Sequence, residues 1–433
     1  MRVIKSLLLG AAAGLAATAG VQAADMPVKA KAVEYVKICS AYGAGFYYIP
    51  GTDICLRLGG AVRADYYHHA PGAFPHIAYN TSGNRTEESH AFRGRGYFIL
   101  DSRQNTAYGT LRTFANIYAA ADTAATGEAT GVTADRAFIQ FAGFTFGRAQ
   151  SFFDFYGSTG PIANLVNWGG QGTGASGWNV LAYTAQFGNG LSGSLSIEDS
   201  RRKPIHMAAA LAGDLAAAAP ATAAALPNIR AGQMMPAVTA NLRVDQAWGS
   251  AQIMGAIQEL RTLSTNEVPA IVGSGHSTTG YAFGGGFTWN NPSAPGSQFG
   301  IQAAYAKGAL GYIQTGATSS IYGVRSNANL AYAHVMDAIY DPALNALHKG
   351  EGWGVNAGYQ HRFNPQWAWS IHGAYTSIEY GAAAALAVGA GTVLDFDVCR
   401  SVRGSTGRRS RASTWASTSC TTSSILRRLR QVS

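Results

Sequence analysis

Apolar and polar residues alternate with period two through most of this chain, which is the pattern of amphipathic β-strands. Between Ile54 and Tyr67, for example, Leu58 and Val62 fall on one face while Arg57 and Arg63 fall on the other. Lipid or a protein core would accept the first face, and only water the second. The pattern therefore predicts an all-β protein.

The connections between the strands alternate between short and long. Six longer loops begin near residues 120, 156, 201, 262, 310 and 381, and the links between them are short. A transmembrane barrel shows this asymmetry, because its periplasmic turns are tight and its extracellular loops are free to grow. A soluble sandwich has no reason to separate the two kinds. We therefore predict a transmembrane antiparallel β-barrel, with fourteen recognisable strands.

The N-terminal segment has the pattern of a secretory signal peptide, with Arg2 and Lys5 before an apolar run and small residues around Ala23. We expect cleavage after Ala23, a periplasmic lead over residues 24–53, and the barrel over residues 54–398.

The alanine-rich stretch 207–226 is the best candidate for a spanning helix. It is broken by charge and proline, so it is predicted to be a flexible loop rather than an amphipathic helix.

The chain has four cysteines. Cys39 and Cys55 lie in the exported N-terminal region, where an oxidising compartment permits a disulfide. We predict that they are bonded, and two unpaired thiols are the alternative. Cys399 and Cys420 lie in or beside the basic C-terminal segment.

The formal net charge of +9 would ordinarily suggest a nucleic-acid partner. However, eight arginines follow Asp397 without any acidic residue among them. Without those eight and the two signal-peptide charges, the formal charge falls from +9 to −1. Because the body of the chain is close to neutral, no nucleic-acid partner is expected.

Several long segments resemble the alphaproteobacterial (Rhizobiales-type) outer-membrane porin family. They include DRAFIQFAGFTFGRAQSFFDFYG, ANLRVDQAWGSAQIMGA, WGVNAGYQHRF and the mature N-terminus ADMPVKAKAVEYVKICSAYGAGFYYIPGTDICLRLGG. The resemblance runs from Met1 to about Val398. It implies a sixteen-stranded barrel that forms a homotrimer in outer-membrane lipid and lipopolysaccharide. It also implies passive diffusion of small hydrophilic solutes and ions, with the loop after Asp154 folded inward as a constriction.

Charged residues on the polar strand faces are the candidate pore lining. The loop from Tyr156 to Gly177 has no acidic residue, so a wall of arginines facing it would favour weak anion preference or near neutrality. The alternative is that these arginines are neutralised by neighbouring aspartates and have no further role. The predicted pore-lining residues are Arg57, Arg63, Asp65, Arg93, Arg95, Arg112, Arg136, Arg148 and Asp154.

Other functions are less well supported by the residues. His68, His69 and His76 have no partner carboxylate in a fixed frame, so neither a metal nor a cofactor is expected. Ser370 and His372 share a strand face, but that spacing is common by chance, and no enzyme is expected. A substrate-specific channel would need an aromatic ladder in the lumen. Most aromatic residues fall on the lipid face, which favours non-specific diffusion.

The segment from Cys399 onward, residues 399–433, loses the alternation and becomes rich in arginine and serine. A disordered basic tail is one interpretation. The other is a reading-frame change, because a good barrel strand, Leu-Gly-Ile-Asp-Val-Leu-Tyr, is compatible with the codons of Trp415 to Thr421 read one base earlier. We expect a tail that is disordered or misfitted. A frameshifted product without its last strands would assemble poorly.

Overall fold

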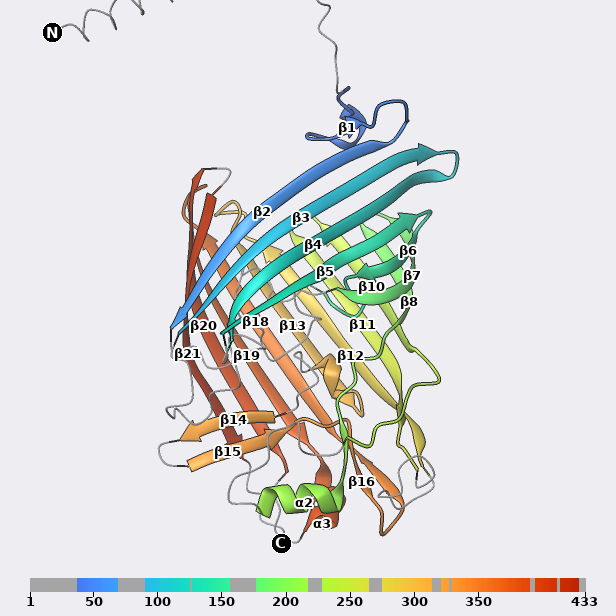
Figure 1. Cartoon of the computed structure of the whole chain (residues 1–433), viewed down its shortest axis with the longest axis vertical. Helices are drawn as coiled ribbons and strands as arrows, with labels where there is room; N and C mark the ends of the chain where they lie inside the picture. The colour runs from blue at the N-terminus through green and yellow to red at the C-terminus, as the bar shows by residue number, and fades with distance from the viewer. Residues whose placement is uncertain are drawn as a thin grey trace, which may run out of the picture.

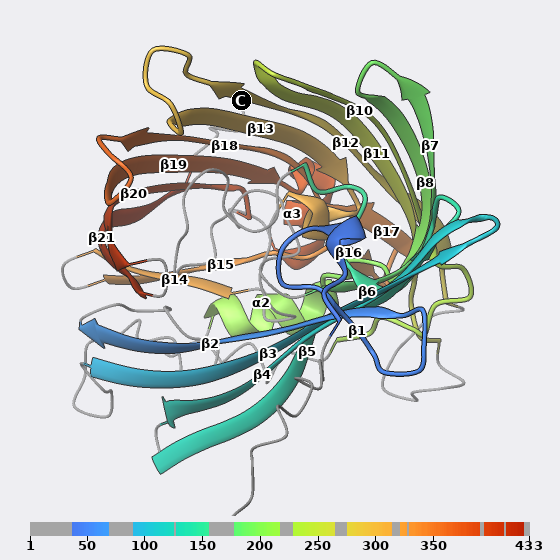
Figure 2. The ribbon, with the colours of Figure 1, turned by 90° about the horizontal axis from the view of Figure 1, so that it is seen from above.

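The structure, a computed structural model, describes residues 37–68, 90–124, 127–155, 177–216, 228–264, 275–313, 321–326, 329–389, 394–410 and 413–427. Most of these residues belong to one sheet of sixteen antiparallel strands. Seen from above, the sheet curls around a central region (Figure 2). The all-β prediction is confirmed.

The strands of the sheet follow one another in chain order, apart from short elements inserted between them. They are β1 (Tyr47–Tyr48), β2 (Cys55–His68), β3 (His90–Thr106), β4 (Gly109–Ala124), β5 (Gly127–Phe141), β6 (Phe144–Ala149), β7 (Trp178–Gly188), β8 (Leu191–Glu198), β10 (Ala237–Gln246), β11 (Gly249–Arg261), β12 (Ser277–Asn290), β13 (Gln298–Lys307), β18 (Glu351–Arg362), β19 (Trp367–Glu379), β20 (Phe396–Ser410) and β21 (Ser413–Arg427).

The two faces of the sheet are those that the alternation predicts. On the outer face, Val62 is 90% exposed and Phe283 is 56% exposed. On the inner face, Ala282, the neighbour of Phe283, is only 3% exposed. Residues that pair across neighbouring strands point to the same face of the sheet. Val62 lies opposite Gly96, and Arg63 lies opposite Arg95. The outer face is therefore apolar and exposed, as a lipid-facing surface must be.

Exposed aromatic side chains mark the short-turn end of the sheet. Trp248 and Phe287 stack there with ring centroids 5.5 Å apart. Such rings suit a membrane interface, where one side is apolar and the other wet. Each short turn from β3 to β19 carries at least one exposed ring: Tyr108, Phe144, Phe187, Trp248, Trp289, Phe363 and Trp367.

At the opposite end, shorter elements fold together in the mouth of the sheet (Figure 1). We call six of them the plug: β9 (Ile205–Met207), α2 (Ala208–Ala216), η3 (Leu310–Tyr312), β16 (Ala338–Asp341), β17 (Ala346–Lys349) and α3 (Gly381–Val388). β9, β16 and β17 form a separate three-stranded sheet. β14 (Ile321–Ser326) and β15 (Asn329–His334) form a hairpin nearby, and η2 (Ser40–Tyr42) precedes β1.

The plug has a hydrophobic core of its own, which packs against the inner face of the sheet. Leu211 of α2 and Tyr312 of η3 are both fully buried in it. The prediction of a flexible loop over residues 207–226 is therefore wrong for α2. Alanine favours a helix, and burial of Leu211 supplies the packing that a short helix needs in water. No helix among the described residues is long and apolar enough to cross a membrane.

A buried charge cluster holds the plug to the sheet. The Asp337 carboxylate accepts hydrogen bonds from the Arg230 guanidinium at 2.6 Å, from the backbone N–H of Lys203 at 2.9 Å and from that of Leu310 at 2.8 Å. Gln258 of β11 donates a further bond at 3.2 Å. Burial lowers the pKa of the Lys203 ammonium to about 8, although the Asp337 carboxylate acts in the opposite direction. These charges lie in a dry environment, where their pairing matters most.

The N-terminal lead is closed by a disulfide between Cys39 and Cys55, whose Cα atoms are 6.0 Å apart. Both cysteines are buried, and Phe46 packs between them in a small cluster. The bond places Cys39 beside the start of β2, where Tyr48 lies opposite Cys55. The predicted disulfide is confirmed.

Thiol labelling of the non-reduced, denatured protein tests the bond in solution. A Cys399→Ser/Cys420→Ser background leaves only Cys39 and Cys55 as possible thiols, and we expect no label before reduction and two labels after it. Closing this loop is worth about 3 kcal/mol by loop-entropy reasoning. Two labels before reduction would contradict the assignment.

The C-terminal strands differ from the expectation for the tail. β20 pairs with β19 from Phe396 to Gly407, and β21 pairs with β20 in turn. For residues 399–410 and 413–427 the expectation of disorder is wrong, because strand pairing uses backbone groups that any sequence supplies. The register of β20 and β21 shifts near Arg400 and Arg408. The sheet has two strands more than the fourteen predicted, and among the described residues β21 does not pair with β1 or β2.

Candidate functional site

The inner face of β2 to β5 carries a concentration of charge that we call the charged wall. Register brings its members to one side of the sheet, because Arg57 lies opposite Asp101, Arg63 opposite Arg95, and Arg93 opposite Asp122. Six predicted arginines and Asp65 are brought together here. The seven arginines exceed the four aspartates by three charges: Arg57, Arg63, Arg93, Arg95, Arg103, Arg112 and Arg136, with Asp65, Asp101, Asp122 and Asp135.

Three arginines converge on one carboxylate near the short-turn end of the wall. Asp101 accepts two hydrogen bonds from Arg112, at 3.0 and 3.1 Å, and two from Arg103, at 3.1 and 3.0 Å. Arg57 reaches it at 3.4 Å. The side chain of Asp101 is fully buried, whereas that of Arg57 is 44% exposed. The cluster thus presents two uncompensated positive charges to solvent. Sequence analysis missed Arg103, which alternation places on the same face as Asp101.

Farther along the wall the arginines differ in how fully they are paired. Arg93 makes two bonds to Asp122, at 2.6 and 2.9 Å, and both side chains are buried. Arg63 bonds to Asp65 at 2.8 Å. Arg95, by contrast, places its guanidinium 4.5 Å from the ring centroid of Tyr118 and makes no hydrogen bond within the described part of the chain.

A β-bulge in β5 adds a further acidic group to the wall. The register of β4 and β5 shifts between Asn116 and Ile117, so that Asp135 is an extra residue and its carboxylate lies 3.3 Å from the Asn116 amide nitrogen. The backbone carbonyl of Asp135 accepts the N–H of Gly177 at 2.7 Å. A Cβ at Gly177 would lie 2.5 Å from that oxygen, so only glycine fits. The bulge therefore fixes the C-terminal end of the predicted constriction loop.

The N-terminal end of that loop lies inside the sheet. Residues 156–176, which include most of the predicted constriction, lie outside the described residues. Before them, the Phe152 carbonyl accepts a bond from Asn241 at 2.6 Å, and that of Phe155 accepts one from Arg243 at 3.0 Å. A Cβ at Gly286 would lie 2.3 Å from the Phe155 ring. Gly286 of β12 therefore makes room for this phenylalanine.

Two buried carboxylates anchor the start of the loop. Glu198, at the end of β8, accepts a bond from the Ser151 hydroxyl at 2.5 Å and one from the Phe152 N–H at 2.8 Å. Asp154 pairs with Arg201 at 2.8 Å, and Arg201 lies over the rings of Phe153 and Tyr312. These contacts tie the chain leaving β6 to the plug and to the far wall.

Two predicted pore-lining residues lie elsewhere. Asp154 is only 4% exposed and belongs to the loop anchor, because β6 ends at Ala149 and strand alternation no longer applies beyond it. Arg148 lies opposite Ala137, on the same side as the exposed side chain of Ile139, and its guanidinium binds the carbonyl of Ala134. By register it belongs to the outward-facing side of the sheet.

The residues considered for other chemistry contribute no site in the described part of the chain. His69 and His76 lie outside the described residues. No group of three or more histidine, cysteine, aspartate or glutamate side chains within the described ranges is arranged to hold a metal ion. Ser370 and His372 are both buried on the inner face of β19.

An antiparallel sheet with an apolar, aromatic-bordered outer face and a charged inner wall defines the class of outer-membrane β-barrel proteins. The chain belongs to the Porin subfamily, whose sequence profile matches residues 25–418. The match continues about twenty residues past Val398, so the expectation that the family likeness ends there is wrong.

Individual relatives agree with this assignment. Porin Omp2b of Brucella suis biovar 1 is 34% identical over 257 residues, which cover 57% of this chain and 64% of that protein. Porin Omp2b of Brucella melitensis biotype 1 is 37% identical over 205 residues, which cover 45% of this chain and 54% of that protein. The chain thus matches less than two thirds of the length of these curated relatives.

A solved structure shares the fold. The crystal structure of the outer membrane channel DcaP of Acinetobacter baumannii superposes with a TM-score of 0.55 and 13% identity, covering 86% of this chain and 96% of that one. At this level of identity the similarity concerns the fold alone. The family match places the chain in the outer membrane.

Proposed function

We propose that the protein is a porin that lets small hydrophilic solutes and ions diffuse passively across the outer membrane. The observation that carries this proposal is the contrast between the two faces of β2 to β5. Their outer face exposes apolar side chains such as Val62, whereas their inner face holds partly exposed guanidinium groups such as that of Arg57. A charged face turned away from lipid needs water beside it.

Liposome swelling tests the activity directly. Full-length protein refolded into liposomes is expected to admit small sugars and to exclude large ones, with rates that fall as the solute grows. The same preparation, assayed for lipase activity, is expected to release no fatty acid, because the proposal makes the protein a channel and not an enzyme. Correctly folded protein that leaves liposomes impermeable would contradict the proposal.

The charge of the wall leads to a prediction for ion selectivity. Because the charged wall has three excess positive charges and the loop from Tyr156 to Gly177 has no acidic residue, we expect weak anion preference. The permeability ratio should be on the order of one to a few, since ions in a water-filled lumen are partly screened. The zero-current potential in a KCl gradient measures it. Clear cation selectivity would show that carboxylates elsewhere dominate the lumen.

We further propose that the protein assembles as a homotrimer surrounded by outer-membrane lipid and lipopolysaccharide. The exposed apolar outer face of the sheet, which includes Phe92, Phe98 and Ile117, offers surface both for lipid and for a second subunit. The molar mass of the detergent-solubilised protein, corrected for detergent, should equal that of three chains. A monomeric mass in active protein would contradict the trimer.

A second candidate is a porin chain that does not complete assembly, and one observation favours it. Across the described residues the last strand, β21, is not hydrogen-bonded to β1 or β2, and an open sheet edge is costly in lipid. Heat-modifiable trimers isolated from outer membranes would exclude this candidate. Recovery of the chain only as an aggregate would support it.

A further inference from the structure

Four aromatic side chains lie on the inner face of the sheet, among the arginines of the charged wall. Tyr97 of β3 contacts Tyr118 of β4 with ring centroids 5.5 Å apart, and Phe114 of β4 stacks on Phe138 of β5 at 5.2 Å. All four are partly buried and partly accessible. The expectation that most aromatics face lipid overlooked these rings, although alternation places Tyr97 on the same face as Arg95.

Guanidinium groups stack on these rings and on a ring of the N-terminal lead. Arg95 lies 4.5 Å from the Tyr118 centroid, and Arg112 lies 5.1 Å from that of Phe114. Near the short-turn end, Arg103 lies 5.0 Å from the centroid of Phe46. A guanidinium that stacks by its flat face keeps its N–H groups, which lie in its plane, available for an anion.

Some of these N–H groups have no partner among the described residues. Within those residues Arg57 makes a single hydrogen bond, at 3.4 Å, and Arg95 makes none. Asp101 is already shared by three arginines. The wall therefore offers free donors and excess positive charge at two heights, one at Arg95 and the other at the Asp101 cluster.

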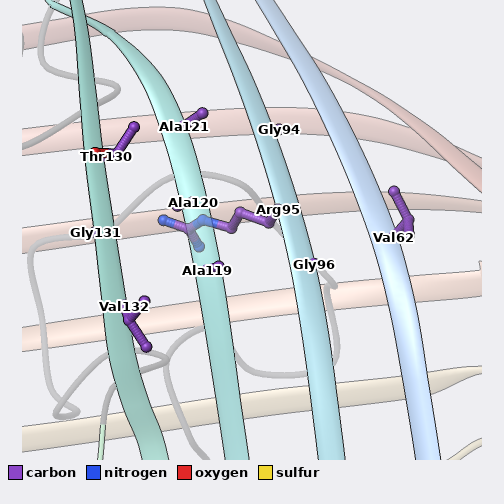
Figure 3. A pocket seen from close by; sticks show the side chains of 10 residues that line it. All are labelled: Val62, Gly94, Arg95, Gly96, Ala119, Ala120, Ala121, Thr130, Gly131 and Val132. Carbon is purple, nitrogen blue, oxygen red and sulfur yellow. The ribbon is translucent and has the colours of Figure 1, made fainter.

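Small residues leave space beside Arg95. Its neighbours on the same face are Ala120 of β4 and Gly131 of β5. Figure 3 shows the Arg95 side chain extending from β3 toward β4 at Ala120.

The stacked groups extend along about half of β3. Arg95 and Arg103 are eight residues apart on β3, and at about 3.4 Å per residue they span about 27 Å. Because the strands of an outer-membrane barrel tilt by about 35–45°, this distance corresponds to about 19–22 Å of the apolar band, whose height is about 25 Å. The groups therefore follow the path that a solute would take across the membrane.

We propose that these residues form a binding track for organic anions that carry a flat apolar group, such as aromatic carboxylates. The track consists of Arg57, Arg95, Arg103, Arg112, Tyr97, Phe114, Tyr118 and Phe138. A carboxylate takes two parallel N–H bonds from a guanidinium, while the attached ring stacks on the neighbouring aromatic side chain. Only a solute with both features makes both contacts. The inference rests on the proposed function, because it requires an open channel.

Single-channel recording with the refolded full-length protein tests the track. Phthalate, an aromatic dicarboxylate, is compared with malonate, a dicarboxylate without a ring, each added to KCl on one side of a planar bilayer. We expect phthalate to interrupt the current with residence times about five- to tenfold longer than those of malonate, as one ring-stacking contact would give. Equal residence times would overturn the proposal. A channel that conducts KCl normally in that case would leave the proposed function standing.

Variants separate the two parts of the track. Tyr118→Leu should shorten phthalate residence to the malonate value, and Arg95→Gln should shorten the residence of both anions. Phe98→Leu is the matched control, because Phe98 lies on the outer face of β3 and is 52% exposed. It should leave the residence times unchanged. Selective phthalate binding that survives both Tyr118→Leu and Arg95→Gln would also overturn the assignment.

Discussion

Replacement of Asp337 by alanine is expected to release the plug from the sheet. The variant leaves Arg230 buried without its carboxylate and removes the acceptor of the Lys203 and Leu310 N–H groups. Breaking a buried ion pair from one side costs about 3–5 kcal/mol. Urea unfolding, followed by tryptophan fluorescence and by protease cleavage within α2 and the β16–β17 hairpin, should show a less stable plug.

Asp245→Asn is the control for this variant. Asp245 also pairs with an arginine, Arg243 at 2.8 Å, but its side chain is 52% exposed. An exposed pair contributes only about 0–1 kcal/mol, so the unfolding midpoint should hardly change. If Asp337→Ala were no more destabilising than Asp245→Asn, the buried cluster would not be what holds the plug.

Replacement of Arg201 by methionine is expected to free the start of the constriction loop. Asp154 then loses its partner at 2.8 Å in a fully buried position, again at a cost of about 3–5 kcal/mol. Because the loop after Phe155 depends on this anchor, single-channel recordings should show a larger and noisier conductance than the parent channel gives.

The double variant Arg201→Met/Asp154→Leu distinguishes loss of the anchor from damage to the barrel. Replacing both partners by apolar residues removes the uncompensated charge and is often close to neutral for stability. We therefore expect it to recover much of the parent stability and to conduct with less noise than the single variant. Unchanged conductance in Arg201→Met would contradict the role of Asp154 and Arg201 in holding the loop.

Period-two alternation predicted the faces of the strands well, for a physical reason. A strand that separates lipid from water meets a different solvent on each face. Alternate residues must therefore be apolar where they face lipid and can be polar where they face water. Val62 and Arg63 are the clearest pair, one exposed on the outer face and the other ion-paired within the wall. The same rule correctly places six of the predicted arginines on the wall. It also places Tyr97 and Arg103 on that face, although the sequence analysis did not name them as pore-lining residues.

The plug could not be read from the sequence, because alternation describes neighbours along one strand and the plug depends on distant contacts. Arg230 and Asp337 are separated by 107 positions, and neither has a pattern that marks it for burial. Gly286 has the same difficulty, since nothing near it in the chain indicates that Phe155 will fill its space. Asp154 was misplaced for a related reason, because β6 ends five residues before it.

The plug makes the two sides of the central region electrically unequal. On the far wall, inner-face groups such as Gln258 and Gln302 are almost wholly buried beneath packed protein, whereas the charged wall keeps its guanidinium groups partly exposed. Protein polarises far less than water. The electric field of the arginines therefore spreads poorly into the plug and is concentrated in the water between the charged wall and the plug. We therefore expect a permeating ion to respond mainly to the charged wall, and the formal charge of +9 for the whole chain is a poor guide to its preference.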